Sequence, residues 1–170
     1  LLVHGNYASK RWFEEQLASP PEGWRLLAPD LPNFGESQPL PHPISIDAYA
    51  RHLLAFADAL GLRSFALLGH SLGGAVAQAL AVAHPERVTH LLLIASAAPD
   101  GHFTSEEHLQ LLESFVGNRE ALAQALSATM PTRRPPYFEG IVDDALAMRP
   151  EAYVGNARAL MAFDVSDSTG

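Results

Sequence analysis

Residues 69–74 read Gly-His-Ser-Leu-Gly-Gly, a Gly-x-Ser-x-Gly pattern in which Ser71 could act as a nucleophile. The apolar run FALLG leads into it and the alanine-rich stretch LGGAVAQALAVAHPE follows the serine. This context predicts a nucleophile elbow, a sharp turn between a buried strand and a helix that exposes the serine beside helix N-terminal amides. The chemistry it indicates is nucleophilic acyl transfer; the alternative is a serine in an ordinary glycine-rich turn.

A second group of candidate residues, His4-Gly5-Asn6-Tyr7, directly follows an apolar strand expected at residues 1–3. Acyl transfer passes through a tetrahedral oxyanion, which needs two preorganised N–H donors. The backbone amide of Leu72, next to the serine, is one candidate donor. The Gly5-Asn6 turn supplies the other, from Asn6 or Tyr7, and we favour Asn6. The competing interpretation is an ordinary strand-to-loop glycine.

Alternating apolar runs and helical patterns through the first hundred residues must position these groups. They predict an α/β fold with a parallel sheet covered on both faces. A helix with an apolar stripe from Tyr49 to Leu60 is expected between Ser45 as N-cap and Gly61 as C′ residue. The helix at 72–84 is apolar almost all round and should be buried. The remaining expected elements are a helix at 10–18 and strands at 25–28, 64–69 and 88–95.

After Pro99 only helical patterns remain. Thr104 with Glu107 predicts a capping box that opens a helix ending before Gly117. Three further helices are expected at roughly 119–129, around 138–146, and from residue 150. Short helices after a strand predict a cap over the sheet edge, so the organisation is a core at 1–100 and a cap at 101–165. Six large side chains of this region could line an apolar pocket or form its core: Phe103, Phe115, Met130, Tyr137, Phe138 and Met161.

Four segments, HGNYAS, APDLPNFGES, GHSLGG and HPERVTHLLLIASAAP, match the α/β-hydrolase superfamily in order and spacing. The chain resembles its serine-esterase-like branch with a helical cap, strongly over residues 1 to about 100. The family's loop usually reads DLPGFGES, and here Asn33 replaces that glycine. Asparagine tolerates a left-handed backbone better than other non-glycine residues, so we expect the loop to survive. The loop borders the pocket in the family, so the change bears on substrate fit.

The resemblance implies a triad in the chain order Ser, then Asp or Glu, then His. In the family, a stretch like RALMAFDVSD leads into the strand that precedes the acid. The chain therefore resembles a fragment cut at both ends, a partial α/β-hydrolase fold whose C-terminal core strands, acid and base are expected beyond residue 170. Asp164 and Asp167 then belong to a connection, and Asp100 is a lesser candidate for the acid. None of the eight histidines has the base's position: His4, His42, His52, His70, His84, His90, His102 and His108.

The implied function is hydrolysis of a small ester, thioester or related carbonyl compound through an acyl-enzyme at Ser71. The amides of Leu72 and Asn6 would hold the oxyanion, and Tyr7 and His70 would contact the substrate. Serine at the elbow argues against the dehalogenase and epoxide hydrolase branches, which use aspartate. The alternatives are a C–C hydrolase or cofactor-free haloperoxidase of the same fold, or a non-catalytic ligand receptor. Without its base, the 170-residue chain alone is expected to be nearly inactive.

The composition of the chain limits the classes of partner and cofactor that it could bind. A net charge of −8 gives no basic surface for nucleic acid. The chain has no cysteine, and its histidines lack metal-site spacing, so no metal or other cofactor is expected. No apolar run approaches the ~20 residues of a membrane span. The expected partner is a small apolar acyl or carbonyl compound. We expect a cytoplasmic location, and the composition leaves the oligomeric state open.

Overall fold

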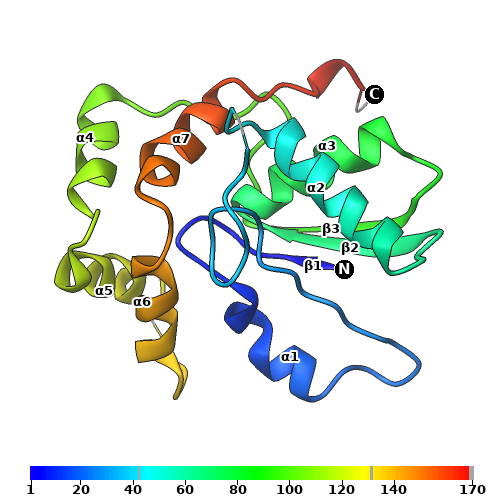
Figure 1. Ribbon diagram of the computed structural model, residues 1–170, viewed down its shortest axis with the longest axis horizontal. Helices are drawn as coiled ribbons and strands as arrows, with labels where there is room; N and C mark the ends of the chain where they lie inside the picture. Colours follow the sequence, from blue (N-terminus) through cyan, green and yellow to red (C-terminus); the bar gives the residue numbers. More distant parts are fainter. Residues whose placement is uncertain (42, 131, 169–170) are drawn as a thin grey trace.

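The computed structural model describes residues 1–41, 43–130 and 132–168. Three strands, β1 (Leu2–Val3), β2 (Phe65–His70) and β3 (Val88–Ile94), form a parallel sheet in the order β1-β2-β3 (Figure 1). In this register Leu2 lies beside Leu68, which in turn lies beside Leu92. The parallel sheet and its helical crossovers confirm the predicted α/β class.

Two helices cover one side of the sheet, which the sequence predicted to be covered on both faces. They are α2 (Ile46–Ala59) and α3 (Leu72–Ala83), whereas α1 (Glu14–Ala18) lies on the other side after a 3₁₀ turn at Lys10–Phe13 (Figure 1). Ser45 caps α2 by accepting the N–H of Ala48 at 3.1 Å, and Gly61 has the predicted left-handed backbone (φ +68°). The first nine residues of α3 are all buried.

The strand expected at 25–28 is not formed as a regular strand. A single backbone hydrogen bond, from the N–H of Leu2 to the carbonyl of Leu27 at 2.8 Å, ties this segment to β1. Two features shorten the ladder: β1 has only two residues, and Pro29 lacks the N–H that a longer strand would donate.

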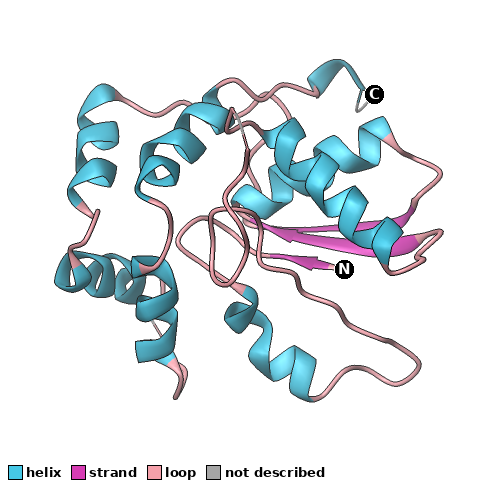
Figure 2. Cartoon of the chain, viewed as in Figure 1, coloured by secondary structure: helices cyan, strands magenta, loops and turns pink. Residues whose placement is uncertain are grey.

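The chain after β3 forms the four expected helices (Figure 2). They are α4 (Glu106–Ser114), α5 (Arg119–Ala128), α6 (Phe138–Leu146) and α7 (Pro150–Met161), which we call the helical region. The N–H of Val165 donates to the carbonyl of Pro99 at 2.7 Å, and that of His102 donates to Leu160 at 3.1 Å. The chain therefore enters and leaves the helical region at the same place.

The capping box predicted at Thr104 is wrong by one residue. Ser105 is the N-cap of α4, and its hydroxyl accepts the N–H of His108 at 3.3 Å. Thr104, one residue before this cap, is buried. A one-residue error at a helix end is ordinary, because neighbouring Thr and Ser both favour the position.

Candidate active site

Ser71 occupies the junction between β2 and α3, where the sequence predicted a sharp turn. Its backbone angles are φ 53° and ψ −118°, a conformation that non-glycine residues rarely adopt. The turn is held by the N–H of Ser71, which donates to Ile94 at 3.0 Å, and by its carbonyl, which accepts from Gly74 at 2.9 Å. The strand-turn-helix geometry of a nucleophile elbow is therefore present.

The loop at residues 4–7 lies directly against this turn. A Cβ built on Gly5 would lie 2.9 Å from the Cβ of Ser71 and 3.0 Å from the Nδ1 of His70. Tyr7, two residues later, has a positive φ of 55°. Leu72, the other predicted oxyanion donor, is fully buried at the start of α3. The structure thus brings together the two segments in which donors were predicted.

His4 links this loop to the next one and is unsuited to act as a base. Its Nδ1 lies 2.8 Å from the carbonyl of Gly5, and its Nε2 lies 3.0 Å from the N–H of Leu31. A carbonyl only accepts and an N–H only donates, so these contacts select the neutral Nδ1–H tautomer. Complete burial lowers the pKa of His4 to about 4, outweighing the opposing effects of the Gly5 carbonyl and Asp30.

The predicted substrate-contacting residues, Tyr7 and His70, each pack on another aromatic ring. His70 stacks on Trp12 with ring centroids 5.5 Å apart, and burial lowers the pKa of the imidazole. Tyr7 meets Tyr153 and Phe115 edge-on at 5.4 and 6.0 Å, and burial raises the pKa of its phenol. These contacts place Tyr7 between the core and the helical region.

Two residues beside the candidate active site, Trp12 and Asn156, were not identified from the sequence. Trp12 falls within the helix expected at 10–18, yet its Nε1 is buried and, among the described residues, finds no hydrogen-bond partner. Asn156, on α7, is fully buried and donates to the side chain of Asn6 at 2.8 Å. Neither residue belongs to a motif. Asn156 stands three residues after Tyr153 and four before Leu160, so its helical spacing is the one local signal that it faces the buried side of α7.

Among the described residues, no hydrogen bond joins the Ser71 hydroxyl to a histidine or a carboxylate. The remaining described histidines lie elsewhere: His84 contacts Glu86 at 3.6 Å, His52 lies on α2, His90 on β3, and His102 and His108 are exposed in the helical region. His42 lies outside the described residues. Asp100 is exposed in the turn after β3.

Asp164 and Asp167 are also exposed. The carboxylate of Asp164 accepts hydrogen bonds from the N–H and hydroxyl of Ser166, which lower its pKa. It is therefore engaged in a local turn.

The residues that the structure describes hold neither a candidate metal centre nor a candidate membrane span. No group of three or more His, Asp or Glu side chains there could hold a metal ion. No described helix is both long and apolar enough to cross a membrane.

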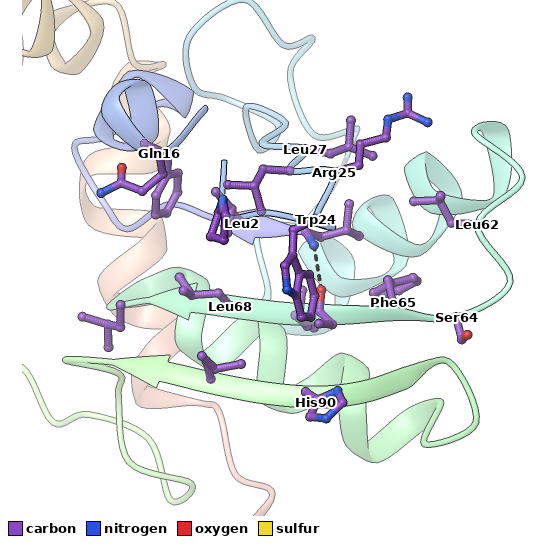
Figure 3. A pocket seen from close by; sticks show the side chains of 18 of the residues that line it. Leu2, Gln16, Trp24, Arg25, Leu27, Leu62, Ser64, Phe65, Leu68 and His90 are labelled. Carbon is purple, nitrogen blue, oxygen red and sulfur yellow. Dashed lines mark hydrogen bonds between the residues drawn. The ribbon is translucent and has the colours of Figure 1, made fainter. Parts of the chain in front are cut away.

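A separate apolar pocket of about 670 Å³ lies on the sheet face beside α1 (Figure 3). Trp24, Leu68 and His90 line it, together with Leu92 and Ile94 of β3. Its described lining includes neither Ser71 nor the 4–7 loop, so it is distinct from the candidate active site.

Comparison with known proteins agrees with this geometry. The family described as "alpha/beta hydrolase fold" matches residues 1–133. The chain is 36% identical over 101 residues to a 2-hydroxymuconate semialdehyde hydrolase of Pseudomonas sp. (strain CF600), covering 57% of this chain and 36% of that protein. It is 35% identical over 158 residues to lipase LipV of Mycobacterium tuberculosis, covering 91% of this chain and 60% of the lipase.

Solved structures show the same fold. An esterase from Exiguobacterium antarcticum superposes with a TM-score of 0.83 at 22% identity, covering 98% of this chain and 68% of the esterase. A thermophilic esterase from Thermogutta terrifontis superposes at 0.78 and 26% identity, covering 97% and 64%. The chain spans between about a third and three fifths of the two sequence relatives. On its sequence and its architecture, this chain belongs to the alpha/beta hydrolase fold family.

Proposed function

We propose that this protein is a serine hydrolase that acts on a small ester, thioester or related carbonyl compound through an acyl-enzyme at Ser71. The observation that carries the proposal is the backbone of Ser71, held at φ 53° and ψ −118° between β2 and α3. Such strain persists only where the surrounding structure enforces it, and it clusters at functional sites. A lipase and a methyl ester esterase among the relatives support the ester class.

In this mechanism the Oγ of Ser71 attacks the carbonyl carbon and a base takes its proton. The backbone N–H groups of Leu72 and Asn6 donate to the oxyanion of the tetrahedral intermediate. The intermediate collapses as the leaving alcohol or thiol takes the proton, and water then hydrolyses the acyl-enzyme by the same steps. Tyr7 and His70 contact the substrate, and the helical region serves as a cap.

We assign the base and its acid to parts of the protein outside residues 1–170. His4 already uses both ring nitrogens, and among the described residues the Ser71 hydroxyl bonds no histidine. The 170-residue chain alone should therefore turn over substrate very slowly, through oxyanion stabilisation only.

The test compares Ser71→Ala with the wild type in the full-length protein. Hydrolysis of p-nitrophenyl butyrate should fall by about 10³-fold or more, and labelling by a fluorophosphonate should vanish. Ser114→Ala is the matched control, because Ser114 is exposed on α4 and its hydroxyl donates to the Leu111 carbonyl of the same helix at 2.7 Å. Turnover that survives Ser71→Ala would refute the proposal.

A second candidate is a C–C hydrolase, favoured by the 36% identity to the 2-hydroxymuconate semialdehyde hydrolase. The two functions differ in the bond that Ser71 or its partners must cleave. We would compare kcat/KM for a short p-nitrophenyl ester and a β-diketone in the same protein. A higher value for the diketone would favour the second candidate.

A further inference from the structure

A buried run of amide and hydroxyl groups connects the loop at Asn33 with the loop at Asn6. Asn33 Nδ2 donates to the Tyr49 hydroxyl at 3.2 Å, and that hydroxyl donates to Asn156 Oδ1 at 2.7 Å. Asn156 Nδ2 then donates to Asn6 Oδ1 at 2.8 Å. Asn33, Tyr49 and Asn156 are all buried, so water does not compete for these bonds. We call these four residues the amide relay.

The direction of the relay is set at one end by the backbone. The N–H of Leu40 donates to Asn33 Oδ1 at 2.9 Å, and a backbone N–H can only donate. The side-chain atom of Asn33 that faces Leu40 is therefore the oxygen, so the other atom, Nδ2, donates to the Tyr49 hydroxyl. The hydroxyl proton of Tyr49 then goes to Asn156 Oδ1, and Asn156 Nδ2 is left to donate to Asn6. At the far end, Asn6 is left with its oxygen accepting and its NH₂ group as the donating end.

The relay fixes Asn6 from the helical region. Asn156 lies on α7, whereas Asn6 sits between Gly5, which abuts Ser71, and Tyr7, which packs on Tyr153. The N–H of Arg149, at the start of α7, also donates to the backbone carbonyl of Asn33 at 3.0 Å. The position of α7 and the conformation of the Asn6 loop are thus coupled by direct bonds.

We propose that Asn156 is a positioning residue: it holds the Asn6 loop so that the backbone N–H of Asn6 is aimed at the oxyanion formed at Ser71. The inference rests on the proposed function, because the aim of Asn6 affects rate only if an oxyanion forms there. It also gives Asn33 a role. At the position where the sequence departs from the usual glycine, Asn33 has φ 72° and supplies the first side-chain donor of the relay.

The test substitutes Asn156→Asp in the full-length protein. A carboxylate keeps the size of the side chain and still accepts from Tyr49, but it cannot donate to Asn6. Asn6 must then turn its amide or lose the bond. We expect kcat for p-nitrophenyl butyrate to fall about 10- to 100-fold with KM changed by less than about threefold, because the misplaced donor acts on the transition state. Tyr49→Phe leaves the hydrogen bond between Asn156 and Asn6 in place, so it should lower kcat by a smaller factor, about three- to tenfold.

Asn118→Ala is the matched control. Asn118 caps α5 of the helical region by accepting the N–H of Ala121 at 3.1 Å, and it lies outside the relay. It should lower the melting temperature while keeping kcat within about twofold. If Asn156→Asp leaves kcat unchanged, or if Asn118→Ala lowers kcat equally, the positioning role is refuted.

A second readout separates this inference from the proposed function. The side-chain amide NMR signals of Asn6 should shift in Asn156→Asp and Tyr49→Phe and stay in place in Asn118→Ala. Signals that do not shift would overturn the relay itself. Turnover that survives Ser71→Ala would instead overturn the proposed function, whatever the NMR spectra show.

Discussion

His4 holds two loops of the candidate site together while it remains uncharged. Its ring bonds the Gly5 carbonyl and the Leu31 N–H, and it packs edge-on against Phe34 at 4.9 Å. Protonation of Nε2 would remove the acceptor for Leu31 and place an unsolvated charge in the core. At neutral pH the native fold therefore excludes the imidazolium form.

This exclusion predicts a pH-dependent stability. The pKa of His4 is lowered from 6.5 to about 4, so between these values the unfolded chain binds a proton that the folded chain does not. The contribution of His4 to the free energy of unfolding is fully present above pH 6.5, falls as the pH falls through this window, and loses nothing further below about pH 4. The total loss is about 3 kcal/mol, of which about 2 kcal/mol should appear by pH 5.

Urea unfolding at pH 7 and pH 5 measures this effect. His4→Gln should reduce the difference between the two pH values, whereas His108→Gln, on the exposed surface of α4, should leave it unchanged. An equal pH dependence in His4→Gln and wild type would show that His4 is not its source.

The residue scale also shows what could be predicted from sequence. Asn33 was expected to tolerate a left-handed backbone, and its φ is 72°. Its hydrogen bond to Tyr49 spans 16 positions, and that of Tyr49 to Asn156 spans 107. Local preference reports on backbone conformation, but bonds between distant residues depend on how the elements pack. Motifs therefore located Ser71 and the Asn6 loop, and only the structure located Asn156.

At the scale of elements, the first turn of α3 is pressed against the end of β1. A Cβ built on Gly73 would lie 2.4 Å from the carbonyl oxygens of both Val3 and His4. Neither atom belongs to a flexible side chain, so any added methyl must separate the helix from the strand. This contact also sets how close Ser71 lies to the Asn6 loop.

Gly73→Ala should therefore destabilise the fold by about 3 kcal/mol, through overpacking against backbone. Gly140→Ala on α6 is the matched control, because its nearest neighbour is the flexible side chain of Arg11 at 3.0 Å. At Gly140 the gain in helix propensity offsets the close contact with Arg11, so the free energy of unfolding should change by less than about 1 kcal/mol. Thermal unfolding of the two variants gives the comparison; equal losses would mean that the α3–β1 contact is not tight.

The elements themselves could largely be predicted, and the exceptions have physical causes. The spacing of apolar residues predicted α2, α3 and the four later helices, because the apolar residues of each helix face a buried surface. The prediction of a strand at 25–28 was wrong because a strand forms only against a partner strand, and β1 has only two residues. No local pattern reveals how long a neighbouring strand will be.

At the scale of the whole molecule, β3 is an edge strand of the described sheet and carries exposed apolar side chains on both faces. Leu91, Leu92, Leu93 and Ile94 are 39–50% exposed, although β3 pairs with β2 along its length. Two of them, Leu92 and Ile94, line the 670 Å³ pocket of Figure 3. Contiguous apolar surface of this kind, on an exposed strand edge, favours association.

The 170-residue chain on its own should therefore bind a hydrophobic dye such as ANS and associate at micromolar concentration. The double substitution Leu92→Lys and Ile94→Lys should lower dye fluorescence by about half and shift elution toward the monomer, because both side chains are 50% exposed. The circular dichroism spectrum should be retained. Leu67→Lys is the contrasting variant: Leu67 is fully buried on β2, so a charge there should unfold the chain and raise dye binding. If the double variant binds as much dye as the parent chain, the apolar surface that binds the dye lies elsewhere. The exposed side chains of β3 would then not control association.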